Sequence, residues 1–117
     1  MVFIMASAFY RWADGDIYEG EYRADKMSGH GIYRYNNGDV YEGGFLNGLS
    51  SGYGIYRYTS GNIYEGGFLN DLPSGYGIFR YADGDVYEGQ YLNGIRSGHG
   101  VIRGADGTII QEGRQIP

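Results

Sequence analysis

Residues 18–40 read YEGEYRADKMSGHGIYRYNNGDV, and the chain repeats this pattern every 23 residues. The triplet Tyr-Glu-Gly begins each copy and occurs at 18–20, 41–43, 64–66 and 87–89. A Gly-x-Gly motif follows in each copy, at 29–31, 52–54, 75–77 and 98–100. A fixed period of roughly 20 to 50 residues is typical of proteins built from stacked copies of one small unit. We therefore expect a repeat protein.

The unit boundaries follow from this period. Full units are predicted at 18–40, 41–63, 64–86 and 87–109. A half unit precedes them at 8–17, because its residues match the second half of the later units. Gln111-Glu112-Gly113 resembles Tyr-Glu-Gly displaced by one residue, which predicts a degenerate cap over 110–117. A chain of 117 residues has room for one domain, so we expect 1–117 to form a single one.

Alternation inside each unit predicts β-strands. Tyr18, Gly20 and Tyr22 would share one face of an extended chain, and this period of two belongs to strands rather than helices. Frequent glycine would cost a helix ~1 kcal/mol per residue. The predicted fold is all-β, a single elongated, twisted, antiparallel sheet of about ten strands built from stacked β-hairpin repeats. At ~4.8 Å per strand it would extend roughly 45–50 Å.

Side-chain parity sets the length of the turn between units. A two-residue loop at Asn37-Gly38 would place Tyr41 on the same face as Arg34. A loop of odd length keeps Tyr33 and Tyr41 on one face. We therefore predict a three-residue connection with a bulge, in which Gly38 adopts the left-handed conformation.

One face of the predicted sheet alternates the largest side chains with glycine. A glycine within a strand leaves a gap that a ring from a neighbouring strand can cover, so a single layer can pack without a second sheet. We expect this structural role for the tyrosines Tyr41, Tyr64 and Tyr87 and for the glycines Gly31, Gly54, Gly77 and Gly100.

The opposite face combines charged and apolar residues. Each of four arginines precedes a glutamate by eight residues, as Arg34 precedes Glu42, which predicts a charge ladder across the hairpin turns. The predicted partner-binding residues on this face are Tyr53, Ile55, Tyr76 and Ile78, with an apolar loop rim at Leu46, Leu69 and Leu92. Contiguous exposed apolar surface usually marks a contact site. We expect these residues to bind a partner segment or a second copy of the chain.

The pattern resembles the MORN (membrane occupation and recognition nexus) repeat family. The resemblance rests on Tyr-Glu-Gly-x-Tyr/Phe, then Gly-x-Gly-x-Tyr/Phe-x-Tyr, then Gly-Asp, over residues 8 to about 113. It implies an elongated array of β-hairpins that serves as a scaffold, a dimerisation unit or a groove for a partner segment. The loop within each unit is usually polar and rich in lysine in this family, but here it is apolar. The family's usual tryptophan near the end of the first strand is replaced by Tyr22, Phe45, Phe68 and Tyr91.

Charge and composition exclude several functions. The net charge of −5, with Lys26 as the only lysine, disfavours binding to nucleic acid or to an anionic membrane. The absence of cysteine excludes disulfides and thiolate sites. His30 and His99 occupy the same repeat position 69 residues apart, and three repeats of ~10 Å would hold them roughly 30 Å apart. We therefore expect no catalytic residues, no cofactor and no metal site.

Two functional interpretations remain. The favoured one is a non-enzymatic scaffold for protein–protein interaction. The alternative is a membrane-associated adaptor for anionic phospholipid, which would require a basic patch. Sheet extension at the open edges, 8–12 and 109–113, is a competing route to self-association.

Localisation is predicted from the first residues of the chain. Residues 1–8 are apolar but lack the positive region of a signal peptide, so we expect a frayed or strand-extending terminus. We expect a cytoplasmic protein, with a cytoskeletal or ciliary assembly as the architectural variant.

Overall fold

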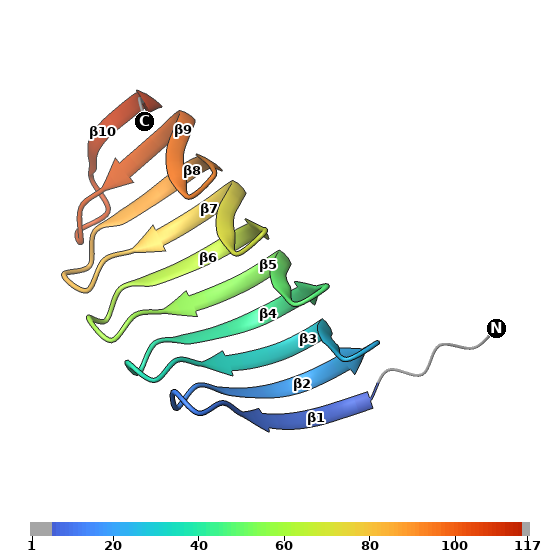
Figure 1. The fold of residues 1–117 in the computed structure, drawn as a ribbon. Helices are drawn as coiled ribbons and strands as arrows, with labels where there is room; N and C mark the ends of the chain where they lie inside the picture. The colour runs from blue at the N-terminus through green and yellow to red at the C-terminus, as the bar shows by residue number, and fades with distance from the viewer. Residues whose placement is uncertain (1–5, 116–117) are drawn as a thin grey trace.

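Ten antiparallel strands form one sheet in the computed structural model, which describes residues 6–115 (Figure 1). The strands are β1 (Ala6–Arg11), β2 (Ile17–Arg23), β3 (Lys26–Arg34), β4 (Val40–Leu46), β5 (Leu49–Arg57), β6 (Ile63–Leu69), β7 (Leu72–Arg80), β8 (Val86–Leu92), β9 (Ile95–Arg103) and β10 (Ile109–Gln115). Each strand pairs with its neighbours in chain order, and the described range contains no helix. With extents of 50 × 31 × 21 Å, the predicted single elongated sheet is confirmed. The prediction of a frayed or strand-extending terminus concerns residues 1–8, of which 6–8 belong to β1 and 1–5 lie outside the described residues.

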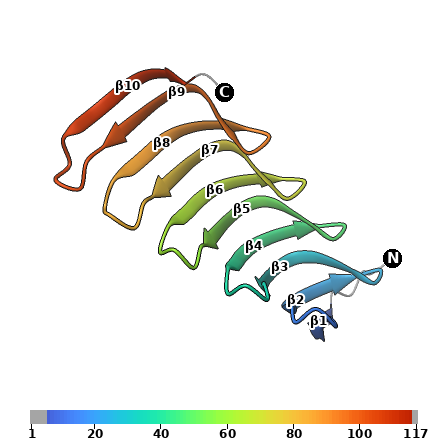
Figure 2. The same cartoon turned by 60° about the vertical axis from the view of Figure 1, so that its left-hand side comes forward.

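Bulges bend the sheet along its strands into a trough, which Figures 1 and 2 show from two sides. β4 and β5 pair regularly from Val40 to Gly43, but the register then shifts, because Phe45 pairs with Ser50. The extra residues of β5 surround Gly52, whose φ of 84° lies in the left-handed region. The same shift recurs between β2 and β3, β6 and β7, and β8 and β9. Bulges of this kind bend a strand and increase its twist.

The turn between successive repeats has the predicted length. The Tyr35 amide donates to the Asp39 carbonyl at 2.9 Å, and the Gly38 amide donates to the Tyr35 carbonyl at 3.0 Å. Three residues therefore connect Tyr35 and Asp39, and Gly38 has a φ of 99°, which favours glycine. Tyr33 pairs directly with Tyr41, so both side chains project from one face as expected.

The turn within each repeat corrects one prediction. Leu46 pairs with Leu49, and only Asn47 and Gly48 separate them. Both central residues have positive φ, 52° and 87°, as in a type I′ turn, whose twist matches that of the flanking strands. The apolar residues therefore end strands instead of lining a loop. This correction applies equally to Leu46, Leu69 and Leu92.

The core is a row of aromatic rings on one face of the sheet. The most deeply buried side chains, at most 2 % exposed, are Tyr18, Tyr41, Tyr64 and Tyr87. These rings lie over Gly31, Gly54, Gly77 and Gly100 respectively, each on the following strand. Tyr41 packs edge-to-face against Phe45 at 5.1 Å between ring centroids and against Phe68 of the next repeat at 4.9 Å. The row therefore runs from repeat to repeat and packs the single layer from one side.

Turn side chains and amides also join neighbouring repeats. The buried Asp39 carboxylate accepts hydrogen bonds from the Tyr56 hydroxyl at 2.8 Å and from the Thr59 amide at 3.0 Å. On the other long edge, the Gly48 amide donates to the Met27 carbonyl at 2.9 Å. Both long edges of the trough are therefore fixed from one repeat to the next.

Candidate interaction surfaces

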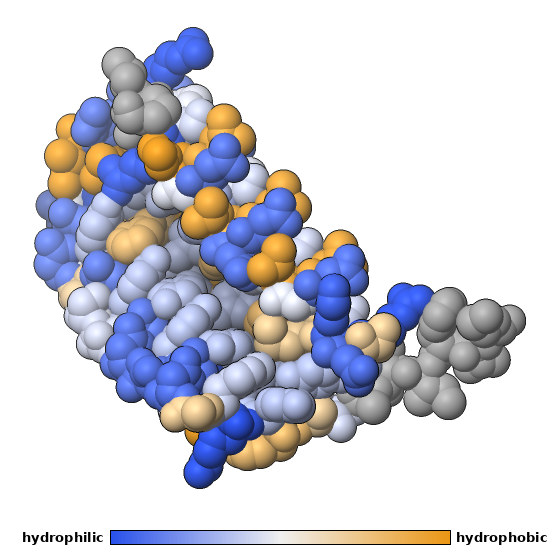
Figure 3. All heavy atoms as spheres, in the orientation of Figure 1, coloured by the Kyte–Doolittle hydropathy of each residue, from blue (hydrophilic) through white to orange (hydrophobic). Residues whose placement is uncertain are grey.

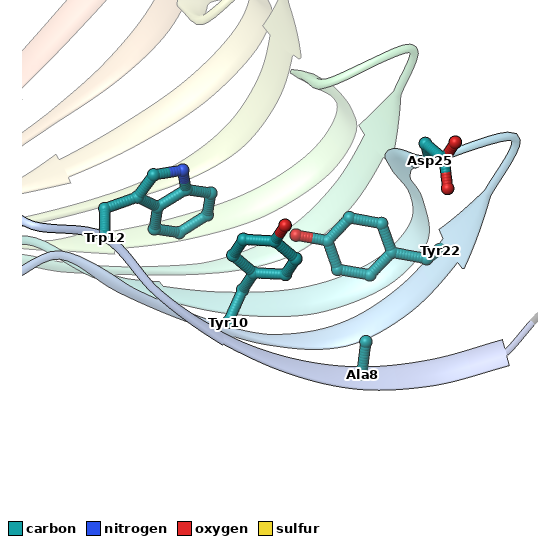
Figure 4. Close-up of a pocket in the computed structure, with 5 residues that line it drawn as sticks. All are labelled: Ala8, Tyr10, Trp12, Tyr22 and Asp25. Carbon is teal, nitrogen blue, oxygen red and sulfur yellow. The ribbon is translucent and has the colours of Figure 1, made fainter.

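The bend gives the sheet two different faces. Figure 4 shows Tyr10, Trp12 and Tyr22 standing inside the bend, so the aromatic face is the concave one. Side chains alternate across a strand. Glutamates such as Glu42, which is next to the core residue Tyr41, therefore project from the convex face.

The convex strip is defined here as Tyr53, Ile55, Tyr76 and Ile78, which lie on β5 and β7. Tyr53 is 60 % exposed and Tyr76 is 54 % exposed. An open cavity of about 480 Å³ lies between them, and Ile78, Glu65 and Arg80 also line it. The structure thus brings three of the four strip residues to one cavity, and Ile55 lies beside it, two residues along β5 from Tyr53.

A carboxylate interrupts the apolar character of the convex strip. Glu65 on β6 pairs with Ile55 on one side and with Ile78 on the other. It accepts hydrogen bonds from the Tyr53 hydroxyl and, at 3.1 Å, from Arg80 Nη1. The hydrogen bond to Glu65 raises the pKa of Tyr53 above its ordinary value. The expected continuous apolar surface is therefore an alternation of apolar and acidic side chains.

The charge ladder is present with a different pairing from the predicted one. Arg34 Nη1 lies 3.4 Å from Glu19 Oε1, and Arg57 Nη1 lies 3.6 Å from Glu42 Oε1. Arg34, Arg57 and Arg80 each contact the glutamate 15 residues earlier, not the one eight residues later. The register places Arg34 diagonal to both Glu19 and Glu42, and the right-handed twist makes the two diagonals unequal.

The leucine rim, defined as Leu46, Leu69 and Leu92, lies where the strands meet the two-residue turns. These side chains are 54 to 60 % exposed. Figure 3 shows hydrophobic residues gathered along the edge of the trough that these turns form. The rim adjoins the convex strip, because Tyr53 pairs with Gly67 and Leu69 lies two residues further along the same strand.

The concave face holds a second candidate surface that the sequence analysis missed. Rings whose centroids lie 4.5 to 5.9 Å apart form a ladder through Tyr10, Trp12, Tyr33, Tyr35, Tyr56, Tyr58, Phe79 and Tyr81. The ladder begins at a cavity of about 400 Å³, lined by Ala8, Tyr10, Trp12, Tyr22 and Asp25 (Figure 4). The signal in the sequence is the alternation of Ala8, Tyr10 and Trp12, on a strand with a single neighbour in the described sheet.

Titratable groups are distributed along the sheet. His30 Nε2 lies 3.8 Å from Glu42, and His99 Nε2 lies 3.9 Å from Glu112, so the two histidines have separate partners. Within residues 6–115, no three potential metal ligands gather at one place. The same range has no helix long and apolar enough to cross a membrane.

The MORN repeat model matches the chain four times in succession, at 18–40, 41–63, 64–86 and 87–109. No curated protein matches the chain significantly. MORN repeats are non-catalytic modules that generally mediate contacts with proteins or membranes. Because the four matches span most of the sequence and the fold is a stack of β-hairpins, the chain belongs to the MORN repeat family.

Proposed function

We propose that this chain is a non-enzymatic scaffold module that binds an extended segment of a protein partner across the convex strip. The observation that carries the proposal is the pair of exposed tyrosines, Tyr53 and Tyr76, at the border of one cavity. Buried aromatic anchors supply much of the binding energy at protein interfaces. No other part of the described chain covers this cavity, so both rings are accessible to a partner.

The alternation on the convex face supports a partner with both apolar and basic side chains. Ile55, Glu65 and Ile78 follow one another across three strands, and Glu88 continues the row. Glu88 accepts a hydrogen bond from the Tyr76 hydroxyl at 3.3 Å. A segment that carries both apolar and basic side chains would complement this surface and the overall negative charge of the protein. The leucine rim extends the apolar contact toward the edge of the trough.

The phospholipid alternative receives less support. Arg34, Arg57 and Arg80 on the convex face already pair with glutamates. An anionic bilayer requires a cluster of uncompensated cations. Sedimentation with vesicles that contain phosphatidylserine separates the two functions, and we expect the protein to remain in the supernatant.

The proposal is tested by capture from a native cell extract with matched variants. The test variant is Tyr53→Ser with Tyr76→Ser. The control is His30→Ser with His99→Ser, because those residues occupy the same repeat position at the two flanks. Proteins that bind the wild type and the histidine variant, but not the tyrosine variant, would support the proposal. Equal capture by all three would place the contact elsewhere.

A further inference from the structure

The two outermost strands occupy complementary places in the repeat. β1 corresponds to the second strand of a unit and β10 to the first strand, and the two types alternate throughout the sheet. Each outer strand has one neighbour in the described sheet. If β10 of one copy lay beside β1 of another, the alternation and the antiparallel order would continue across the junction. Exposed strand edges are templates for such pairing.

β10 departs from the repeat at its core position. Ile102 on β9 pairs with Tyr87 on one side and with Gln111 on the other. Gln111 therefore stands where a buried tyrosine stands in the other repeats. Ile110 is the extra residue at the register shift before it, which accounts for the one-residue displacement seen in the sequence.

β1 departs from the repeat at the position that receives the tyrosine ring. Gly20 pairs with Gly31 on one side and with Ala8 on the other, so Ala8 takes the place of a covered glycine. A methyl group added at Gly31 would lie 2.2 Å from the hydroxyl oxygen of Tyr18. Ala8 therefore has no room for a tyrosine above it in this geometry.

The cavity at the start of the aromatic ladder is the space above Ala8. Inside the sheet, the equivalent space above Gly31 holds the ring of Tyr18, which packs against Phe45 at 5.2 Å. At the outer edge, Ala8 forms the floor, and Tyr22 is the counterpart of Phe45 (Figure 4). The cavity is thus a receptor site for a side chain from a preceding strand.

We propose that the outer edge of β10 in one copy pairs with the outer edge of β1 in a second copy, with Gln111 entering the cavity above Ala8. The two departures from the repeat lie on the two strands that would meet. A flexible, unbranched glutamine can lie above an alanine where the rigid ring of a tyrosine cannot. Each departure therefore compensates for the other at this junction.

Charge at the two edges fits the same junction. Within the sheet, the glutamate of one strand pairs with the arginine of the next, as Glu19 pairs with Arg34. Arg11 is the corresponding arginine on β1, and Glu112 occupies the glutamate position on β10, opposite Val101. Docking would bring Arg11 of one copy beside Glu112 of the other.

Apolar exposure at the edges points the same way. Four large apolar residues on or beside the outer strands are 51 to 61 % exposed to solvent: Phe9, Tyr10, Ile109 and Ile110. The contact joins two different surfaces, so each added copy leaves one free edge at either end. Such a heterologous contact produces a head-to-tail assembly, which is an open filament unless the rotation between copies closes a ring. It uses the ends of the sheet and does not rest on the function proposed for the convex strip.

Sedimentation velocity over a concentration series, with the full chain, tests this junction. Wild type should form dimers and longer species as concentration rises. Gln111→Tyr should weaken the association roughly tenfold or more, because its ring meets the Ala8 methyl group. Ala8→Gly should change it by less than about fivefold, since only one methyl contact is lost. The double variant recreates Tyr18 above Gly31 and should restore association.

One further variant, checked by circular dichroism, separates loss of association from loss of the fold. Ala8→Phe fills the cavity from its own strand, so it should abolish association while the circular dichroism spectrum is unchanged. A wild type that stays monomeric into the millimolar range overturns the proposal. So does an association that Gln111→Tyr leaves intact, or one that Tyr53→Ser with Tyr76→Ser removes instead.

Discussion

Tyr41 lies so close above Gly54 that a methyl group on that glycine would meet the tyrosine ring at 2.5 Å. The Tyr41 hydroxyl donates to the Gly44 carbonyl at 2.8 Å, which fixes the ring in this position. Tyr64 and Gly77 repeat the arrangement one unit later. A single-layer sheet can therefore bury an aromatic core because glycine leaves room for the ring directly above the neighbouring strand.

Enlarging a covered glycine should destabilise the fold more than removing a surface charge. Gly54→Val or Gly77→Val should reduce the free energy of unfolding by about 1–3 kcal/mol or more, because the ring has no space to move into. Glu65→Ala should cost less than about 1 kcal/mol, since it breaks exposed contacts only. Urea titrations followed by circular dichroism measure the difference. Equal losses would contradict the packing described for the concave face.

The side chains that follow the turns between repeats offer a test of how neighbouring repeats are joined. Asp39→Ala removes the acceptor of the Tyr56 hydroxyl and of the Thr59 amide, so it should cost about 1–3 kcal/mol. Asn62 occupies the same position one repeat later and is the matched control, because its Oδ1 accepts from the Ala82 amide at 2.8 Å and the repeat counterpart of Tyr56 is Phe79, which has no hydroxyl. Asn62→Ala should therefore destabilise the protein less in the same thermal or urea unfolding experiment. A larger effect at Asn62 would show that the tyrosine bond contributes little.

Alkaline pH should unfold the protein through its core tyrosines. Burial raises the pKa of Tyr18, and likewise that of Tyr64, from the ordinary 10.0 to about 12. The folded state holds these protons more tightly than the unfolded state, so its stability is fully present below pH 10.0 and falls as the pH rises toward about 12. Tyrosinate absorbance and circular dichroism should change together over this range. Ionisation of all the tyrosines near pH 10.0 with an intact sheet would contradict this prediction.

The repeat period accounts for what could be predicted from sequence. The alternation of Tyr18, Gly20 and Tyr22 predicts strands, and parity around Gly38 predicts the three-residue turn. The sequence analysis predicts a loop around Leu46 and Leu49 and so does not predict the turn at Asn47-Gly48, although Asn-Gly is a strong hairpin signal. Assigning these leucines to strands requires knowing that Leu46 pairs with Leu49.

The surfaces were less predictable because they depend on the relation between strands. Arg34 has two diagonal glutamates, and the alternation of residues does not reveal which one the twist brings closer. Glu65 lies between Ile55 and Ile78, but this can be seen only from the strand register and not from the sequence. The cavity above Ala8 requires both the bend of the sheet and the comparison with Gly31. The sequence therefore predicts which residues share the convex face, but not that an acidic side chain lies between Ile55 and Ile78.

The binding of a designed peptide tests the central claim, that the convex strip binds a partner segment, most directly. The probe is a fluorescent peptide with alternating apolar and basic residues, titrated by anisotropy against wild type and the two variant pairs. The account predicts saturable binding that weakens roughly tenfold or more in Tyr53→Ser with Tyr76→Ser. His30→Ser with His99→Ser should bind like the wild type. Unchanged affinity in the tyrosine variant, or equal binding of an acidic peptide of the same length, would contradict the claim.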